Sequence, residues 1–338
     1  MSAPGHLMAA EIAEIPAVID RQLRENFSDY MALGEEWAKA PPLFFATCAR
    51  GTSDQAALFF KYLTEIGTGI PVASLGPSLG SLFDGGLRMN GARLLAISQS
   101  GASPDLVALA RKAASGGAGT VALLNTVDSP LGQVAGKVLP LAAGQERAVA
   151  ATKSFVASLV AVAAIHAGQT GDYLLRHELL ALPDVLRSRK NARLPDFRPL
   201  ARTRRLFCLG RGLGLAIAGE AALKFKETCL LAAEGASTAE FRHGPLALAD
   251  AETAALVFLL DDVTRHGAEA LINTLEDRGA TVMVLGEEGT NPASRLRHPA
   301  TQAIAAITLF YAAILELALS LGLDPDLPPH LVKATLTE

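Results

Sequence analysis

The sequence predicts an α/β protein with two tandem, doubly wound domains, each built on a parallel sheet that helices cover on both faces. Three observations predict this fold class: the length, an internal repeat, and short apolar runs without polar interruptions. The chain has 338 residues, 50% of them hydrophobic, and about 150 residues per domain favours two domains with a core each. Unbroken apolar runs are typical of strands buried on both faces of a parallel sheet.

The internal repeat has a constant spacing of 161 residues, since Arg50 corresponds to Arg211 and Thr120 to Thr281. It joins three pairs of apolar runs: 43–51 with 206–212, 93–97 with 254–260, and 119–124 with 280–285. Each half is therefore expected to alternate strand and helix three times. Ligands of such sheets bind outside the carboxyl ends of the strands, which directs attention to Gly51 and Ser98.

Five segments are predicted along the chain. Apolar residues at helical spacing from Glu11 to Trp37 predict a helical N-terminal segment. The apolar stretch 155–167 is shorter than the ~18–20 residues that span a bilayer, so we expect a buried helix and no membrane partner. A charged helical connector is expected over 172–200 and an apolar helix over 301–322, before a proline-rich extended tail. The expected boundaries are 1–40 (helical segment), 41–170 (first domain), 171–200 (connector), 201–322 (second domain) and 323–338 (tail with Lys333).

Composition excludes several classes of function. A net charge of −4 leaves no basic field for a nucleic acid. Three cysteines without a CxxC pair, and an N-terminus unlike a secretion signal, predict a cytoplasmic protein with no disulfide scaffold. No metal-ligand spacing is present, and Gly210-Arg211-Gly212-Leu213-Gly214 lacks the third glycine of a dinucleotide site, so we expect neither a metal nor a nucleotide cofactor.

The loop Ser98-Gln99-Ser100-Gly101-Ala102-Ser103-Pro104 follows a buried strand and enters a helix, with Ser103 suited to the N-cap. Free backbone N–H groups and the helix dipole favour an anion there, so the loop predicts a neutral cradle for a phosphate monoester. A capped helix with a polar loop is the alternative. Gly51-Thr52-Ser53 at the neighbouring strand end favours the cradle. The second half has Asp261-Asp262 at this position, so one phosphate site per chain is expected.

Three kinds of acid–base group lie in the second half. Glu220, Lys224 and Glu227 occupy one helical face, either as a solvated ion-pair cluster or as a buried proton-transfer group. His243 lies in a loop broken by glycine and proline, where it either faces solvent or transfers protons. Lys333 is either a tail lysine or, if desolvated, a nucleophile toward a carbonyl.

Five motifs in this order resemble the sugar isomerase (SIS) family, and within it the isomerase part of glucosamine-6-phosphate synthase and the aminosugar-phosphate deaminases/isomerases. The resemblance covers about residues 11–338. The motifs are Ser98 to Gly101, Val149 to Phe155, Glu220 to Glu227, His243 to Leu248, and the tail around Lys333.

The resemblance implies two SIS subdomains of flavodoxin-like fold in a homodimer, with a sugar phosphate held by Ser98, Gln99, Ser100, Ser103, Thr52 and Ser53, and lined by Val149 and Ala150. It implies that Glu227 moves a proton between C1 and C2, with Lys224 and Glu220 as companions. His243 would open the sugar ring from the partner subunit, and Lys333 would form a Schiff base with the ketose.

The chain departs from the family pattern at three places: Ala102, Ala151, and Pro329-His330 before the tail lysine. It begins at the isomerase part, with Ser2 where the synthase carries its glutaminase cysteine, so we expect no use of glutamine nitrogen. The predicted reaction is deamination of glucosamine 6-phosphate to fructose 6-phosphate and ammonia. The alternatives are a fructosamine-phosphate deglycase, another phosphosugar aldose–ketose isomerase, and a non-catalytic sugar-phosphate sensor; the sugar epimer and the direction in the cell stay open.

Overall fold

The computed structural model describes residues 3–188, 193–286 and 296–333 and forms two compact units, each around one parallel sheet. The five-stranded unit comprises Ala17–Glu146, Lys153–Leu180 and Val332–Glu338. The four-stranded unit comprises Met1–Pro16, Arg147–Thr152 and Ala181–Leu331. The predicted fold class is confirmed.

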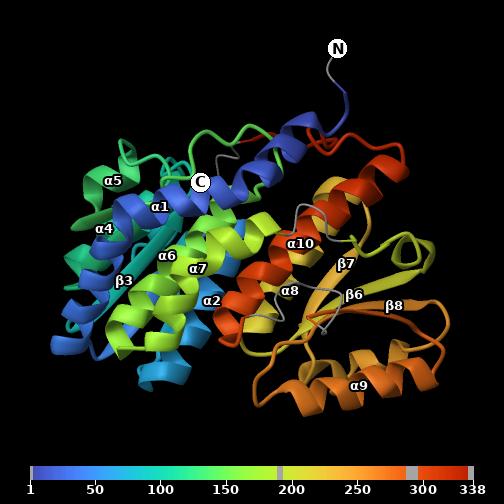
Figure 1. The fold of residues 1–338 in the computed structure, drawn as a ribbon. Coiled ribbons are helices and arrows are strands. Elements are labelled where there is room, and N and C mark those ends of the chain that lie inside the picture. The colour runs from blue at the N-terminus through green and yellow to red at the C-terminus, as the bar shows by residue number, and fades with distance from the viewer. Residues whose placement is uncertain (1–2, 189–192, 287–295, 334–338) are drawn as a thin grey trace. The chain divides into compact units, whose positions relative to one another are not determined.

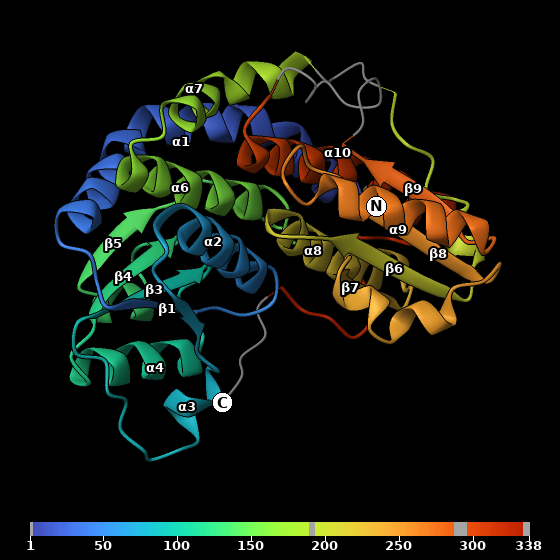
Figure 2. The same ribbon diagram turned by 90° about the horizontal axis from the view of Figure 1, so that it is seen from below.

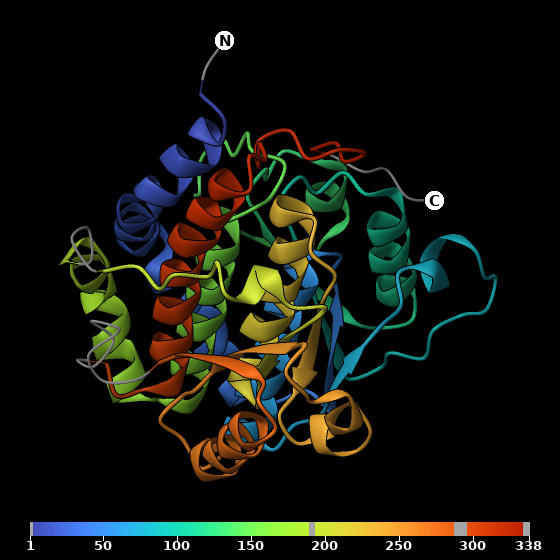
Figure 3. The same cartoon turned by 90° about the vertical axis from the view of Figure 1, so that its right-hand side faces the viewer.

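The five-stranded unit has the strand order β2-β1-β3-β4-β5, with every pairing parallel. Helices α2 and α6 cover one face of this sheet and α4 covers the other (Figure 2). The segment between β2 and β3, which carries α3, extends away from the sheet (Figure 3). The elements are α1 (His6–Lys39), β1 (Phe44–Cys48), α2 (Thr52–Thr68), β2 (Val72–Ser74), α3 (Ser78–Ser81), β3 (Ala92–Ser98), α4 (Pro104–Ser115), β4 (Gly119–Leu124), α5 (Pro130–Val134), β5 (Lys137–Pro140), α6 (Lys153–Thr170) and α7 (Tyr173–Arg187), of which α1 and α7 continue into the four-stranded unit.

Residue type explains the central layers of this unit. Six of the seven residues of β3 are buried, as expected for a strand covered on both faces. Helix α6 is apolar around its whole circumference, and its residues from Lys153 to Gly168 are buried, which confirms the predicted buried helix.

The four-stranded unit has the order β7-β6-β8-β9, again all parallel. Helices α8 and α10 lie side by side on one face and α9 lies on the other (Figure 1). Phe207, Phe241 and Leu271 belong to the core cluster on the α9 face. The elements are β6 (Arg205–Gly210), α8 (Leu213–Cys229), β7 (Ala233–Ser237), β8 (Thr253–Phe258), α9 (Arg265–Asp277), β9 (Thr281–Leu285) and α10 (Pro299–Ser320), with 3₁₀ turns at Leu200–Arg202, Glu240–Arg242 and Pro245–Leu248.

The internal repeat is visible in backbone geometry. Gly51 precedes α2 with φ 55° and ψ −129°, and Gly212 precedes α8 with φ 56° and ψ −124°. A positive φ of this kind is accessible to glycine and costly for other residues. The two halves therefore use the same strand-to-helix turn 161 residues apart.

The structure corrects two expectations. The three runs expected in each half omitted the edge strands β2, β5 and β7, which are short and carry exposed residues, so they lack the fully apolar pattern of the inner strands. The connector is helical only to Arg187, and residues 193–197, which include Pro195, have no regular structure. Residues 189–192 of the connector and 334–338 of the tail lie outside the described residues.

Helix α10 is long and apolar enough to cross a membrane, with a mean hydropathy of 2.0 over its best window. Of that window, 67% is buried within the fold, and core helices of globular proteins meet the same criterion. The hydropathy of α10 is therefore consistent with its contacts with α8.

Candidate active site

The register of the five-stranded sheet determines which loops lie next to one another. Cys48 near the end of β1 pairs with Ala96 of β3, and Ser98 at the end of β3 pairs with Leu124 of β4. The carboxyl ends of these three strands therefore meet at one edge of the sheet. The residues that follow them, 51–53, 99–103 and 125–126, gather there.

The loop after β3 is shaped by its own serines. The hydroxyl of Ser98 accepts a hydrogen bond from the Gly101 N–H at 3.0 Å, and that of Ser100 accepts one from the Ala102 N–H at 3.3 Å. Ser103 lies at the N-cap of α4 and is followed by Pro104, as predicted, but its side chain makes no capping hydrogen bond. In the first turn of α4, Pro104 has no N–H group. The Leu106 N–H donates to the Asp105 carboxylate at 2.8 Å, and the Val107 N–H donates to the Ser103 carbonyl at 3.1 Å. The groups that favour an anion here are therefore the hydroxyls and the amide of the loop after β3, together with the positive end of the helix dipole.

An ion pair links the two loops of the predicted cradle. The guanidinium of Arg50, two residues after β1, donates to the carboxylate of Asp105 in the first turn of α4. Asp105 is fully buried, whereas the Arg50 side chain is 42% exposed. The loop motifs predicted neutral groups here and carried no signal of this ion pair. The pair ties the turn at Gly51 to the start of α4.

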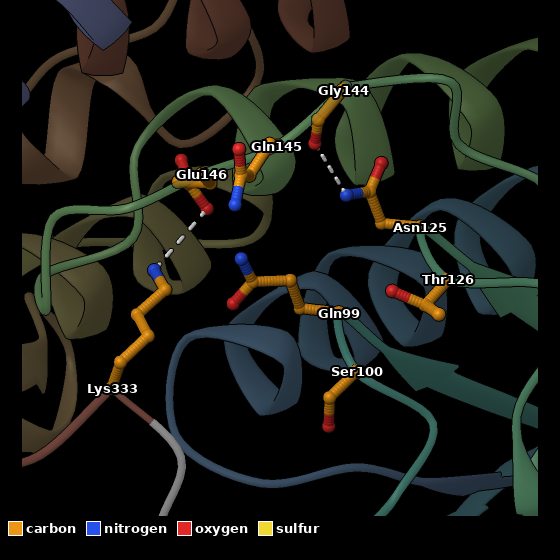
Figure 4. A pocket seen from close by; sticks show the side chains of 8 residues that line it. All are labelled: Gln99, Ser100, Asn125, Thr126, Gly144, Gln145, Glu146 and Lys333. Carbon is orange, nitrogen blue, oxygen red and sulfur yellow. Dashed lines mark hydrogen bonds and ion pairs between the residues drawn. The ribbon is translucent and has the colours of Figure 1, made fainter.

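A cavity of about 390 Å³ opens beside the loop after β3, and the predicted residues Gln99, Ser100 and Lys333 line it (Figure 4). Lys333 comes from the C-terminal tail, so the fold brings it into one pocket with two residues of the phosphate loop. The other lining residues are Asn125, Thr126, Gly144, Gln145 and Glu146.

Sequence reasoning missed these five lining residues. Asn125 and Thr126 follow β4 directly, so the strand-end rule that identified Ser98 could have found them. The loop 144–146 lies between β5 and α6 and has no periodic pattern. Asn125 fixes this loop, because its amide donates to the Gly144 carbonyl at 2.7 Å and its oxygen accepts from the Ala143 N–H at 2.8 Å.

Glu146 is the buried charge of the pocket, with a fully buried side chain. One carboxylate oxygen accepts from the backbone N–H of Ser154 at 3.3 Å. The other accepts from the Ser154 hydroxyl and lies 3.9 Å from the Lys333 ammonium. The carboxylate therefore joins the first turn of α6 to the tail lysine.

The predicted acid–base cluster lies on α8 and is buried. Lys224 is fully buried, with its ammonium 3.2 Å from Glu220 and 2.5 Å from Glu227. Glu220 is fully buried and accepts a hydrogen bond from the Tyr311 hydroxyl at 2.8 Å, whereas Glu227 is 21% exposed. Of the two carboxylates, Glu227 is the one that solvent or a ligand can reach.

The environment of this cluster shifts two pKa values. Burial raises the pKa of Glu220 from 4.5 to about 7, an effect that Lys224 opposes and Glu227 reinforces. Burial by itself lowers the pKa of Lys224, but the carboxylates of Glu220 and Glu227 outweigh it and the pKa is raised. Lys224 is therefore a fixed cation between two carboxylates.

The remaining predicted residues also lie in the four-stranded unit. His243 follows the 3₁₀ turn Glu240–Arg242 and is exposed. Ala150 is buried and Val149 half-buried in the segment 147–152. The buried carboxylate of Glu11 on α1 holds that segment by accepting from the N–H groups of Arg147 and Ala148. Within 3–188, 193–286 and 296–333, no group of three or more His, Cys, Asp or Glu side chains has the arrangement of a metal site.

The raised pKa of Glu220 predicts a pH-dependent stability. Between about pH 4.5 and 7 the folded chain holds a proton that the unfolded chain has lost, so stability falls as the pH rises through this window. The Glu220→Gln variant has no such proton. Relative to this variant, the free energy of unfolding of the unaltered chain should fall by on the order of 1–3 kcal/mol between about pH 5 and 8. Urea unfolding of both proteins at the two pH values checks this, and parallel pH profiles would contradict the assignment.

Comparison with known proteins places this geometry in a family. The SIS domain matches twice, over residues 45–167 and 199–320. The glutamine–fructose-6-phosphate aminotransferase (isomerizing) of Halobacterium salinarum is 33% identical over 304 residues, which cover 84% of this chain and 50% of that protein. The chain spans 50% to 59% of the length of such relatives.

Two solved structures share the fold. A protein of Silicibacter pomeroyi DSS-3, provisionally described as a phosphosugar isomerase, is 39% identical with a TM-score of 0.88, over 95% of this chain and 99% of that one. Glucosamine-6-phosphate deaminase of Thermotoga maritima has a TM-score of 0.77 over 98% of this chain and 100% of that one; at 20% identity it supports the fold alone. The chain belongs to the SIS domain family and carries two SIS domains in tandem.

Proposed function

We propose that the chain is a phosphosugar isomerase that acts as an aminosugar-phosphate deaminase, converting glucosamine 6-phosphate to fructose 6-phosphate and ammonia. The observation that carries the proposal is the shared pocket of Lys333, Gln99 and Ser100, which joins an amine nucleophile to an anion-binding loop. The relative from Silicibacter pomeroyi and the aminotransferase relatives support a reaction on a sugar phosphate.

The phosphate is the part of the substrate that does not react. The hydroxyls of Ser98, Ser100 and Ser103 and the amide of Gln99 would bind it, with Thr52 and Ser53 from the adjacent turn. The dipole of α4 favours negative charge at the same place. Such binding fixes the position of the sugar and contributes energy remote from the reacting carbons.

The proposed chemistry begins when His243 opens the sugar ring by proton transfer. Glu227 then removes the proton from C2 of the open-chain aldehyde and delivers it to C1, while one proton passes from the amine nitrogen to O1, which leaves an imine at C2. Water hydrolyses this imine to the ketose and ammonia. Lys224 holds Glu227 in place, with Glu220 as its second buried partner. Lys333 binds the ketose carbonyl carbon as a Schiff base.

Release of ammonia and fructose 6-phosphate from glucosamine 6-phosphate tests the reaction directly. Equal amounts of both products are expected, and Glu227→Gln should lower the rate about 10²-fold or more because the proton-transfer group is lost. Glu234→Gln is the matched control, since it removes an exposed carboxylate from the same unit. Full turnover by Glu227→Gln would disprove the assignment of the base, and release of neither product would disprove the deaminase.

We also propose a homodimer in which each subunit lends His243 to its partner's site, consistent with the exposure of His243 on its own chain. Chains carrying His243→Ala and chains carrying Glu227→Gln are each expected to be inactive. Mixed under conditions that exchange subunits, they should recover about a quarter of the normal activity, because half of the dimers are mixed and each has one intact site. If the mixture stays inactive although exchange is complete, His243 acts within its own chain.

A further inference from the structure

The Glu146–Lys333 pair has a feature that phosphate binding and ring opening do not use. Of the eight residues that line the pocket, these two have a carboxylate or an ammonium group, and Figure 4 shows the Lys333 side chain directed at the carboxylate. The distance of 3.9 Å is an ion-pair contact rather than a hydrogen bond, and the Lys333 side chain is 28% exposed. The lysine is thus close to a base and open to the cavity at once.

The surroundings favour a carboxylate at this position. The carboxylate of Glu146 contacts the first turn of α6, where the helix dipole stabilises negative charge, because Ser154 donates to both of its oxygens. The other cavity walls are amides, hydroxyls and backbone. Two charged residues lie near Glu146 in the sequence: Arg147, which is exposed, and Lys153, which is buried. Among the described lining residues, Glu146 is therefore the acid–base partner that lies beside the lysine.

Schiff-base formation at Lys333 requires two proton transfers, and each needs a neighbouring group that accepts or donates the proton. An ammonium has no lone pair, so it must lose a proton before it attacks a carbonyl carbon. The resulting carbinolamine then loses its hydroxyl as water, which requires a proton to be supplied. One carboxylate beside the nitrogen can accept the first proton and supply the second.

We propose that Glu146 is the proton shuttle of Lys333, an inference that rests on the Schiff base of the proposed function. Glu146 takes one proton from the ammonium. The amine nitrogen attacks C2 of the ketose, a C–N bond forms, the C=O π bond breaks, and one proton passes from nitrogen to oxygen to give the carbinolamine. Glu146 then returns its proton to the hydroxyl, the C–O bond breaks, water leaves, and the nitrogen lone pair forms the iminium. The carboxylate ends unchanged.

A purely structural role is the competing explanation, because Glu146 also anchors the loop to α6 through Ser154. Three variants separate the roles. Glu146→Gln keeps the size and one of the two acceptor oxygens for Ser154 but transfers no proton. Glu146→Asp keeps a carboxylate on a shorter arm. Ser154→Ala keeps the carboxylate and removes its hydroxyl partner.

The experiment measures how fast fructose 6-phosphate becomes attached to Lys333 in the full chain under excess cyanoborohydride, with the adduct located by mass spectrometry. Glu146→Gln should form the adduct about 10²-fold more slowly at an unchanged half-saturating ketose concentration, as expected for loss of a general acid–base group. Glu146→Asp should recover part of this rate. Ser154→Ala should slow it by no more than about fivefold, the effect of one ordinary hydrogen bond.

Two results would overturn the shuttle while leaving the proposed function intact: adduct formation by Glu146→Gln at the normal rate, or equal slowing in Glu146→Gln and Ser154→Ala. If the unaltered chain forms no adduct at Lys333 yet releases ketose phosphate and ammonia, the proposed Schiff base is disproved. The proposed role of Glu146 as proton shuttle is then disproved as well. If it shows neither adduct nor turnover, the proposed function fails as well. Release of ammonia and ketose is measured in the same samples to distinguish these outcomes.

Discussion

The parallel pairing of β1 with β3 and of β3 with β4 is the constraint on which the candidate site depends. It brings the turn at Gly51, the serine loop and Asn125 to one edge of the sheet. Each of these loops has a separate anchor: a positive-φ glycine, a serine that bonds its own backbone, and an amide that bonds the loop before α6. Because the anchors are local, the loops keep their shapes without a ligand, and binding requires little further ordering.

Buried charge is the second common feature of the two units. Removing an ion pair from water costs several kcal/mol, which only close partners and hydrogen bonds offset. In the four-stranded unit Lys224 has two carboxylates, one of which is hydrogen-bonded to Tyr311. In the five-stranded unit Asp105 has Arg50, and Glu146 has Ser154 and Lys333. Such pairs are weak evidence for stability, and perturbed or desolvated titratable groups are frequent at sites of chemistry.

The sequence predicted the fold class because the repeat and the apolar inner strands follow directly from burial on both faces. It predicted the buried α6 and the start of α4 at Ser103-Pro104 for the same local reasons, although the Ser103 side chain makes no capping hydrogen bond. Edge strands such as β7 were not predicted, because exposed residues interrupt their apolar pattern. Among the candidate functional residues, Ser98 to Ser103 in the five-stranded unit and the α8 cluster in the four-stranded unit carried local signals. Glu146 and Arg50 did not, because their partners Ser154 and Asp105 become neighbours only when the chain folds.

In the proposed function the tail lysine and the phosphate loop form one ligand site. The most direct measurement is the rate at which a small acylating reagent modifies Lys333, compared with Lys137, an exposed lysine of the same unit. Fructose 6-phosphate should slow the modification of Lys333 severalfold, to an extent that follows ligand concentration, and leave Lys137 unchanged. If saturating sugar phosphate leaves Lys333 as reactive as before, the lysine lies outside the ligand site and the account is contradicted.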